Sequence, residues 1–152
     1  MISSELVARL RAETGGGVMD CKKALEKTGG DFEKAKQILV SHAQVIAQKK
    51  QERSVKQGLI ECYCHSGKIG VVLELNCETD FVARNAEFKT LAKDLAMQIA
   101  SMNPKNLEDL LASNFIKDES STVQALIEQA VAKTGENIQI KRFVRYELGE
   151  EN

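Results

Sequence analysis

The chain has 152 residues, with 43% apolar side chains, 28% charged side chains and a formal net charge of −1 at pH 7. This length suits one ordinary domain, or a small helical module followed by a domain of about a hundred residues. The near-zero net charge argues against a protein that coats nucleic acid through its overall electric field, and the ordinary composition argues against a fibre or a disordered tail.

The start of the chain and its hydropathy bear on where the protein works. Residues 1–5 lack the basic start and apolar run of a secretory signal. No stretch approaches the ~20 consecutive apolar residues of a membrane span. We therefore expect a soluble, cytoplasmic protein that binds no membrane.

Three short helices are predicted within residues 1–42. Ser3 is a good N-cap for the first helix, and the glycines at 15–17 end it because glycine favours open backbone conformations. Asp31 is the N-cap candidate of the third helix. The apolar residues at helical spacing are Leu6, Val7, Leu10, Met19, Cys21, Ala24, Leu25, Phe32, Ala35, Ile38 and Leu39. So small a module lies near the lower limit for independent folding, and we expect it to dock onto another surface.

Residues 43–56 are polar and basic and predict a helical or flexible connector. Its cations are Lys49, Lys50, Arg53 and Lys56. A nucleic-acid patch is the alternative interpretation. No aromatic residue interleaves these cations for base stacking, which favours a solvated linker.

A β-hairpin is predicted next, from runs at 59–64 and 69–77 joined by the glycine-containing turn 65–68. In the second run Val71, Leu73 and Leu75 share one face, and Glu74 and Asn76 share the other. This alternation indicates a sheet that is covered on one side only.

Helices and one further strand complete the predicted core, residues 57–149. Apolar residues recur at helical spacing over 88–99, 107–111 and 123–131, and Ser121 with Gln124 forms a capping box for the last of these helices. Residues 138–148 alternate as a third strand of the same sheet. The residues expected on one side of that strand are Ile138, Ile140, Val144 and Tyr146. The predicted fold class is α+β, with a three-helix module followed by a three-stranded antiparallel sheet backed by helices.

No nucleotide-binding or catalytic motif is present. The glycines at 15–17 lead into Val18, Met19 and Asp20, not into the Lys and Ser or Thr of a phosphate-binding loop, so we expect no bound GTP or ATP. His42 and His65 belong to no recognisable nucleophile signature. We therefore expect a protein that is not an enzyme and that uses no cofactor.

The cysteines are Cys21, Cys62, Cys64 and Cys77. Cys62, Cys64 and His65 together with Cys77 invite a zinc interpretation, but the spacing lacks the paired C-x-x-C of tight tetrahedral sites. A Cys64–His65 dyad is disfavoured because neighbours on a strand point to opposite faces. We expect reduced, metal-free thiols.

The connection between the predicted hairpin and the next helix, residues 76–85, has an unusual composition. Polar Glu78, Thr79 and Asp80 lead directly into apolar Phe81 and Val82. Phe81 could tuck beneath the connection as part of the core, or it could be an exposed aromatic anchor, the residue kind that dominates interface energetics.

Several motifs of this chain resemble the elongation factor Ts family of translation. They lie at residues 6–11, 14–25, 30–31, 67–71, 74–85 and 135–138, where the sequences read LVARLR, TGGGVMDCKKAL, GD, GKIGV, ELNCETDFVARN and GENI. They span nearly the whole chain in the family's order.

The resemblance implies a guanine-nucleotide exchange factor for elongation factor Tu. It implies a ubiquitin-associated-like module at residues 1–42 that docks on the GTPase domain, and an α+β core. Three sets of partner-binding residues are implied: Arg11, Val18, Met19 and Lys22 in the module; Thr79, Asp80, Phe81 and Val82, which disturb the partner's magnesium site; and Thr134, Gly135, Glu136 and Asn137 in a core turn.

Longer family members carry a second copy of the core and a helical hairpin, for which this chain lacks room. We expect a homodimer to restore the missing surface. Two other classes stay open from the residues alone: a ubiquitin-associated-type adaptor unrelated to translation, and a small RNA-binding protein that uses residues 49–56.

Overall fold

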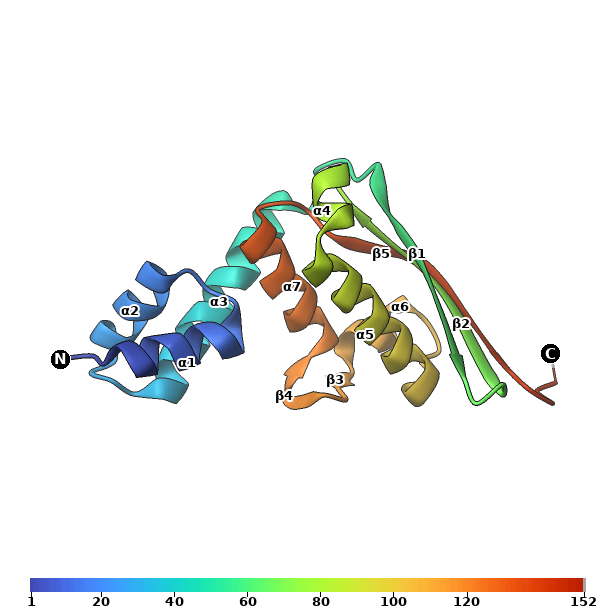
Figure 1. Cartoon of the computed structure of the whole chain (residues 1–152), viewed down its shortest axis with the longest axis horizontal. Helices are drawn as coiled ribbons and strands as arrows, with labels where there is room; N and C mark the ends of the chain where they lie inside the picture. Colours follow the sequence, from blue (N-terminus) through green and yellow to red (C-terminus); the bar gives the residue numbers. More distant parts are fainter. Residues whose placement is uncertain (152) are drawn as a thin grey trace.

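The computed structural model describes residues 1–151 and confirms the predicted α+β class. Figure 1 shows three helices at one end of the molecule, a pair of long helices in the middle and a twisted sheet at the other end. The helices are α1 (Ser4–Thr14), α2 (Val18–Lys27), α3 (Phe32–Lys50), α4 (Asp80–Arg84), α5 (Ala86–Met102), α6 (Leu107–Ala112) and α7 (Val123–Thr134). The strands are β1 (Gln57–His65), β2 (Ile69–Cys77), β3 (Asn114–Phe115), β4 (Asp118–Thr122) and β5 (Gln139–Glu147).

Helices α1, α2 and α3 form a module with its own small core. The predicted caps are confirmed: the Ser3 side chain accepts a hydrogen bond from the Leu6 amide at 3.2 Å, and Asp31 accepts one from the Lys34 amide at 3.1 Å. The buried apolar residues of the module are Val7, Leu10, Cys21, Ala24, Leu25, Ala35 and Leu39.

Helix α3 extends beyond the module. It continues to Lys50 and packs against α7, so the first part of residues 43–56 is helical. Ala43 is buried on this stretch. Because one continuous helix belongs to the module and also contacts the core, it links the two parts of the chain (Figure 1).

The core of residues 57–151 is a three-stranded antiparallel sheet with β2 between β1 and β5. The predicted hairpin turn is confirmed, with left-handed backbone at Ser66 and Gly67 and a 3.0 Å hydrogen bond from the Lys68 amide to the His65 carbonyl. Helix α5 packs on β1 and β2. Val71, Leu73 and Leu75 are at most 2% exposed on the face that it covers, as the alternation predicts.

The predicted facing of the last strand is wrong in its second half. The register of β5 against β2 shifts between Glu74 and Leu75, whose partners are Arg142 and Ile140, so that Lys141 is the extra residue of a β-bulge. The bulge reverses the alternation. Ile140 faces the core, but Val144 and Tyr146 lie on the opposite, outer face of the sheet, 40% and 69% exposed.

The segment before α7 also differs from expectation. A two-stranded ribbon of β3 and β4 lies between α6 and α7, and the sequence analysis predicts no strand there. Helix α7 is capped by Thr122, whose side chain accepts from the Ala125 amide at 3.1 Å, and not by Ser121. Over the described residues 1–151, no helix is long and apolar enough to cross a membrane.

Two glycines of the sheet give a matched test of this packing. Gly58 has φ +146°, and a Cβ atom there would lie 2.1 Å from the Leu75 carbonyl oxygen, whereas a Cβ at Gly70 would meet nothing within 4 Å. We predict that Gly58→Ala lowers the free energy of unfolding by more than ~2 kcal/mol, because it adds backbone strain and a steric clash. Gly70→Ala should change it by less than ~1 kcal/mol. Urea denaturation of both variants checks this, and equal losses would contradict the β1–β2 register.

Candidate functional site

Residues 79–82, here the apical segment, lie in the connection from β2 to α5 and include the cap and the first residues of the short helix α4. Thr79 caps α4, because its hydroxyl oxygen accepts from the Val82 amide at 3.4 Å. Asn85 then caps α5 by accepting from the Glu87 amide at 2.8 Å. Figure 1 shows α4 at the apex of the molecule, near the start of β1 and the end of α3.

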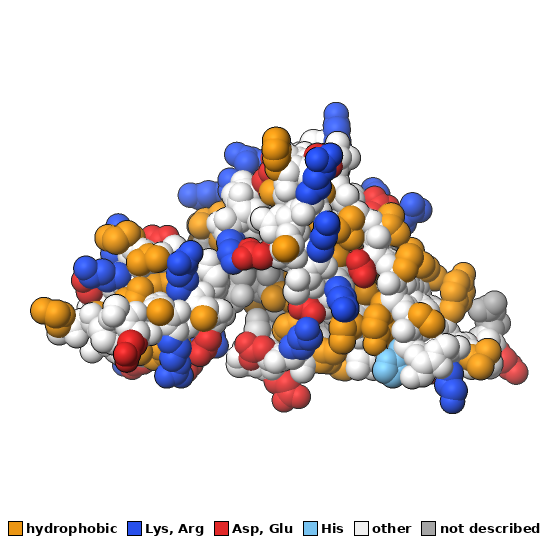
Figure 2. All heavy atoms as spheres, viewed as in Figure 1, with side chains coloured by type: hydrophobic (Ala, Val, Ile, Leu, Met, Phe, Trp, Pro, Cys, Tyr) orange, Lys and Arg blue, Asp and Glu red, His pale blue; other side chains and the backbone are white. Residues whose placement is uncertain are grey.

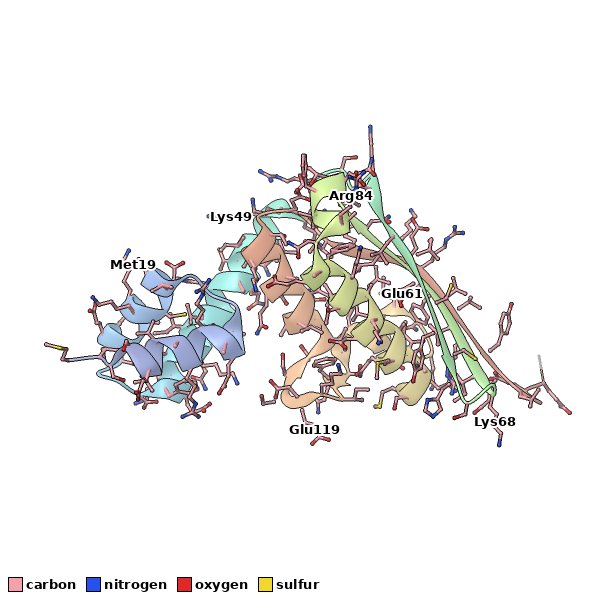
Figure 3. All side chains as sticks on the ribbon, viewed as in Figure 1. Met19, Lys49, Glu61, Lys68, Arg84 and Glu119 are labelled. Carbon is pink, nitrogen blue, oxygen red and sulfur yellow. The ribbon has the colours of Figure 1, made fainter. Side chains whose placement is uncertain are left out.

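Phe81 projects from this segment and is 89% exposed. The residue of α4 that enters the core is Ala83, which is 6% exposed. The structure therefore excludes the interpretation of Phe81 as a core residue. Figure 2 shows hydrophobic side chains among Lys and Arg side chains at the apex, and Figure 3 places Arg84 there. Asp80 is also exposed and pairs with Arg84 at 2.6 Å.

Glu136 fastens the apical segment to the core turn, residues 134–137. One carboxylate oxygen accepts from the backbone amides of Glu78 and Thr79 at 3.1 and 3.0 Å, and the other accepts from the Thr79 hydroxyl at 2.6 Å. Hydrogen bonds to an ionised acceptor are the strong ones in proteins. The apical segment and the core turn are far apart in the sequence, and Glu136 joins them directly.

Glu78 and Asn137 complete this junction in the reverse direction. The Glu78 carboxylate accepts from the Asn137 backbone amide at 2.7 Å and lies 3.6 Å from the Arg53 guanidinium. The Asn137 side chain is 3% exposed, and its amide donates to the carbonyl oxygens of Gln51 and Arg53 at 3.3 and 2.8 Å. The core turn therefore also holds the chain just after α3.

The module residues Arg11, Val18, Met19 and Lys22 lie on a separate surface. Val18 and Met19 are 50% and 59% exposed at the start of α2. Arg11, Val18 and Lys22 line a groove of about 640 Å³ whose other walls include apolar Ile2 and Val7. Figure 3 shows Met19 on the module, far along the molecule from Arg84 at the apex, so the structure does not bring these two predicted sites together.

His65, Cys62 and Cys64 are exposed on β1. His65 Nδ1 lies 2.9 Å from the Tyr63 hydroxyl, and Cys62 and Cys64 are exposed on the outer face of the sheet. Within residues 1–151, no three His, Cys, Asp or Glu side chains are placed to hold a metal ion.

Cys77, the last residue of β2, is buried and contacts the apical segment. Its thiol donates to the Thr79 carbonyl at 3.2 Å. Burial, followed by the nearby Glu136 charge, raises the pKa of the Cys77 thiol from 9.0 to about 11. Because the unfolded chain releases this proton at lower pH, the thiol's contribution to stability is complete below about pH 9 and is lost as the pH rises toward 11.

We predict that a thiol reagent at pH 8 distinguishes the cysteines. Cys62 and Cys64 are exposed and should be labelled in the native protein, whereas Cys21 and Cys77 are buried and hold raised pKa values, so they should react only after unfolding. Mass spectrometry of native and denatured samples counts the labels. Native labelling of Cys77 as fast as that of Cys62 would contradict the packing beneath the apical segment.

Comparison with known proteins places the chain among translation factors. A family model described as "Elongation factor TS" matches residues 78–152, a span that includes the apical segment and the core turn. The protein named "Elongation factor Ts" from Thermodesulfovibrio yellowstonii is 43% identical over 193 aligned residues, which cover 98% of this chain and 97% of that relative. The protein of the same name from Thermotoga neapolitana is 42% identical over 194 residues, covering 99% and 98%.

Relatives differ from this chain in length. The two alignments above are longer than the chain's own 152 residues, so those relatives carry internal residues that have no counterpart here. The "Elongation factor Ts" of a Nostoc species is 48% identical over 148 residues, covering 97% of this chain but 47% of the relative. These names support a role in translation elongation, and the chain belongs to the elongation factor Ts family.

Proposed function

We propose that this protein is a guanine-nucleotide exchange factor that binds elongation factor Tu carrying GDP, disturbs its magnesium site and promotes GDP release. The observation that carries the proposal is Phe81, which is 89% exposed on a short helix that Glu136 fastens to the core. A large aromatic side chain held in water is costly for a lone molecule and useful at an interface.

Exchange is reciprocal coupling, since a factor that binds the empty partner more tightly lowers the partner's affinity for nucleotide by the same factor. Moving the partner from mostly loaded to mostly empty takes ~5.5 kcal/mol of differential binding. Burial of Phe81 offers ~1.5 to 3 kcal/mol, so it acts together with other contacts. No nucleotide site of its own and no catalytic group are required, and the protein acts as a binding factor and not as an enzyme.

The four residues of the apical segment would have different roles. Phe81 and Asp80 are exposed and would meet the partner, Phe81 as an apolar wedge and Asp80 as a carboxylate beside the magnesium ion. Thr79 caps and anchors the segment, and Val82 packs against the main core. Thr134, Gly135, Glu136 and Asn137 form the neighbouring contact region.

The module, residues 1–42, would dock on the GTPase domain through Arg11, Val18, Met19 and Lys22. Its groove combines apolar walls with the cations Arg11 and Lys22, which suits a partner surface that carries both apolar and acidic side chains. Residues 43–56 connect the module to the core of 57–149, which would carry exchange and dimerisation. Such a factor would work in the cytoplasm, where elongation takes place.

The outer face of the sheet is the proposed homodimer surface. Its apolar members are Ile60, Cys62, Cys64, Val72, Val144 and Tyr146. Ile60 and Tyr146 are 56% and 69% exposed, and no helix covers this side in Figure 1. A contiguous exposed apolar patch favours burial against a partner, and a two-fold axis would let the same patch serve both copies.

We predict that Phe81→Ala slows GDP release from elongation factor Tu at least tenfold, because that factor corresponds to ~1.4 kcal/mol, within the value of one buried aromatic side chain. The free energy of unfolding should change by less than ~1 kcal/mol, since the ring lies outside the core. Asp80→Ala should show the same pattern more weakly.

Stopped-flow release of labelled GDP and a urea melt of each variant check this prediction. Met102→Ala, which removes another exposed apolar side chain at the far end of α5, is the matched control and should exchange normally. A Phe81→Ala protein that is strongly destabilised, but whose folded fraction exchanges at the normal rate, would refute the wedge.

The dimer gives a separate prediction. Val144→Asp places a charge on the outer face beside Val72 of the central strand, so light scattering at micromolar concentration should show the mass fall from a dimer to a monomer. Val45→Asp, on an exposed position of α3, should leave the mass unchanged. A wild-type protein that is monomeric under these conditions and retains its full rate of GDP release at nanomolar concentration would contradict the homodimer proposal.

A further inference from the structure

The Glu136 carboxylate makes three hydrogen bonds within its own chain. It accepts from two backbone amides and one hydroxyl, all donated by Glu78 and Thr79, which are 58 and 57 positions away in the sequence. Glu136 is itself half-buried, and its contact with the Thr79 hydroxyl is short at 2.6 Å. Three of the roughly four acceptor sites of this carboxylate are therefore occupied within the chain.

The apical segment needs contacts with the rest of the chain to hold its conformation. Helix α4 has five residues, too few for a helix to be stable alone in water. Its first turn depends on Thr79, whose hydroxyl donates to Glu136 at 2.6 Å while accepting from the Val82 amide at 3.4 Å. The anchor is thus connected to α4 through a single residue, Thr79, and Phe81 lies between Thr79 and Val82 in the chain.

We propose that Glu136 is a positioning residue for exchange: its carboxylate keeps the apical segment in the shape that presents Phe81 to the partner. This inference rests on the proposed function. If docking through the module occurs whatever the shape of the segment, the maximal release rate scales with the fraction of molecules in which the segment is correctly shaped. The concentration of factor at half-maximal rate then depends on the docking surface and stays nearly constant.

Asn137 adds hydrogen bonds that hold the chain directly after the module's last helix, α3. Its buried side-chain amide holds the carbonyl oxygens of Gln51 and Arg53, directly after α3, while its backbone amide donates to Glu78. Adjacent residues of one turn therefore fix the end of the module's longest helix and the base of the apical segment. When the module docks, Phe81 is already held at a set distance from it, which raises its effective concentration at the partner.

Two variants separate positioning from folding. Glu136→Ala removes all three acceptor contacts, whereas Glu136→Gln keeps an oxygen for the two backbone amides. Glu119→Ala is the control, because Glu119 lies in β4 and Figure 3 places it at the edge of the molecule opposite Arg84. Hydrogen exchange followed by NMR gives a readout that needs no partner.

In Glu136→Ala we expect the Glu78 and Thr79 amides to exchange at least tenfold faster, with the amides of Leu73 and Leu75 unchanged. Glu136→Gln should recover most of the protection, and Glu119→Ala should match the wild type. Unchanged protection of Glu78 and Thr79 in Glu136→Ala would overturn the inference. So would a general loss of protection that includes the core strands in both Glu136 variants.

The second test of the inference measures the rate of GDP release with the same variants. Glu136→Ala should lower the maximal rate of GDP release from elongation factor Tu about tenfold, with less than a twofold change in the half-maximal concentration, and Glu136→Gln should restore most of it. Adding Glu136→Ala to Phe81→Ala should slow release by less than a further twofold, because Glu136 acts through Phe81. Independent, multiplying effects would overturn positioning. A Phe81→Ala protein with normal release would overturn the role of Phe81 on which this inference rests, although exchange itself would stand. A wild-type protein that leaves GDP release at its spontaneous rate would refute the proposed function, and the hydrogen-exchange arm would still decide whether Glu136 shapes the segment.

Discussion

One carboxylate, that of Glu136, joins the exposed apical segment to the core turn through three hydrogen bonds. The strand β2 ends at Cys77, and the chain must then turn sharply before α5 begins. At this turn the backbone amides of Glu78 and Thr79 point away from any sheet partner, and Glu136 supplies the acceptor for both. An unsatisfied amide in a partly buried position would cost free energy, so the carboxylate stabilises a turn that exposes Phe81.

The two faces of the sheet differ in burial. Its inner face, with Leu73 and Leu75 fully buried under α5, holds the core together. Its outer face and the apex carry large exposed apolar side chains, Tyr146 and Phe81 among them, that lie outside that core. A protein whose work is to bind another protein can place its binding residues outside the core, where substitutions alter binding without unfolding the chain. The bulge at Lys141 contributes to this division, because it turns Val144 outward.

The sequence predicted what depends on local patterns and missed what depends on distant contacts. Caps such as Asp31 and the hairpin turn were predictable because capping and turn preferences act within a few residues. The β-bulge was not, since nothing near Lys141 marks it, and the polar β3–β4 ribbon has no alternating apolar face. Local composition allowed Phe81 either a buried or an exposed position. The contact between Glu136 and Thr79, which fixes the turn beneath it, joins residues 57 positions apart and has no local signature.

The central claim is that this chain speeds nucleotide release from elongation factor Tu. The most direct measurement is the rate at which purified elongation factor Tu loses labelled GDP, followed with increasing amounts of this protein and an excess of unlabelled GDP. We expect a release rate that rises with factor concentration and saturates, at least tenfold above the spontaneous rate. A release rate that stays at the spontaneous value at every concentration, with a folded protein, would contradict it.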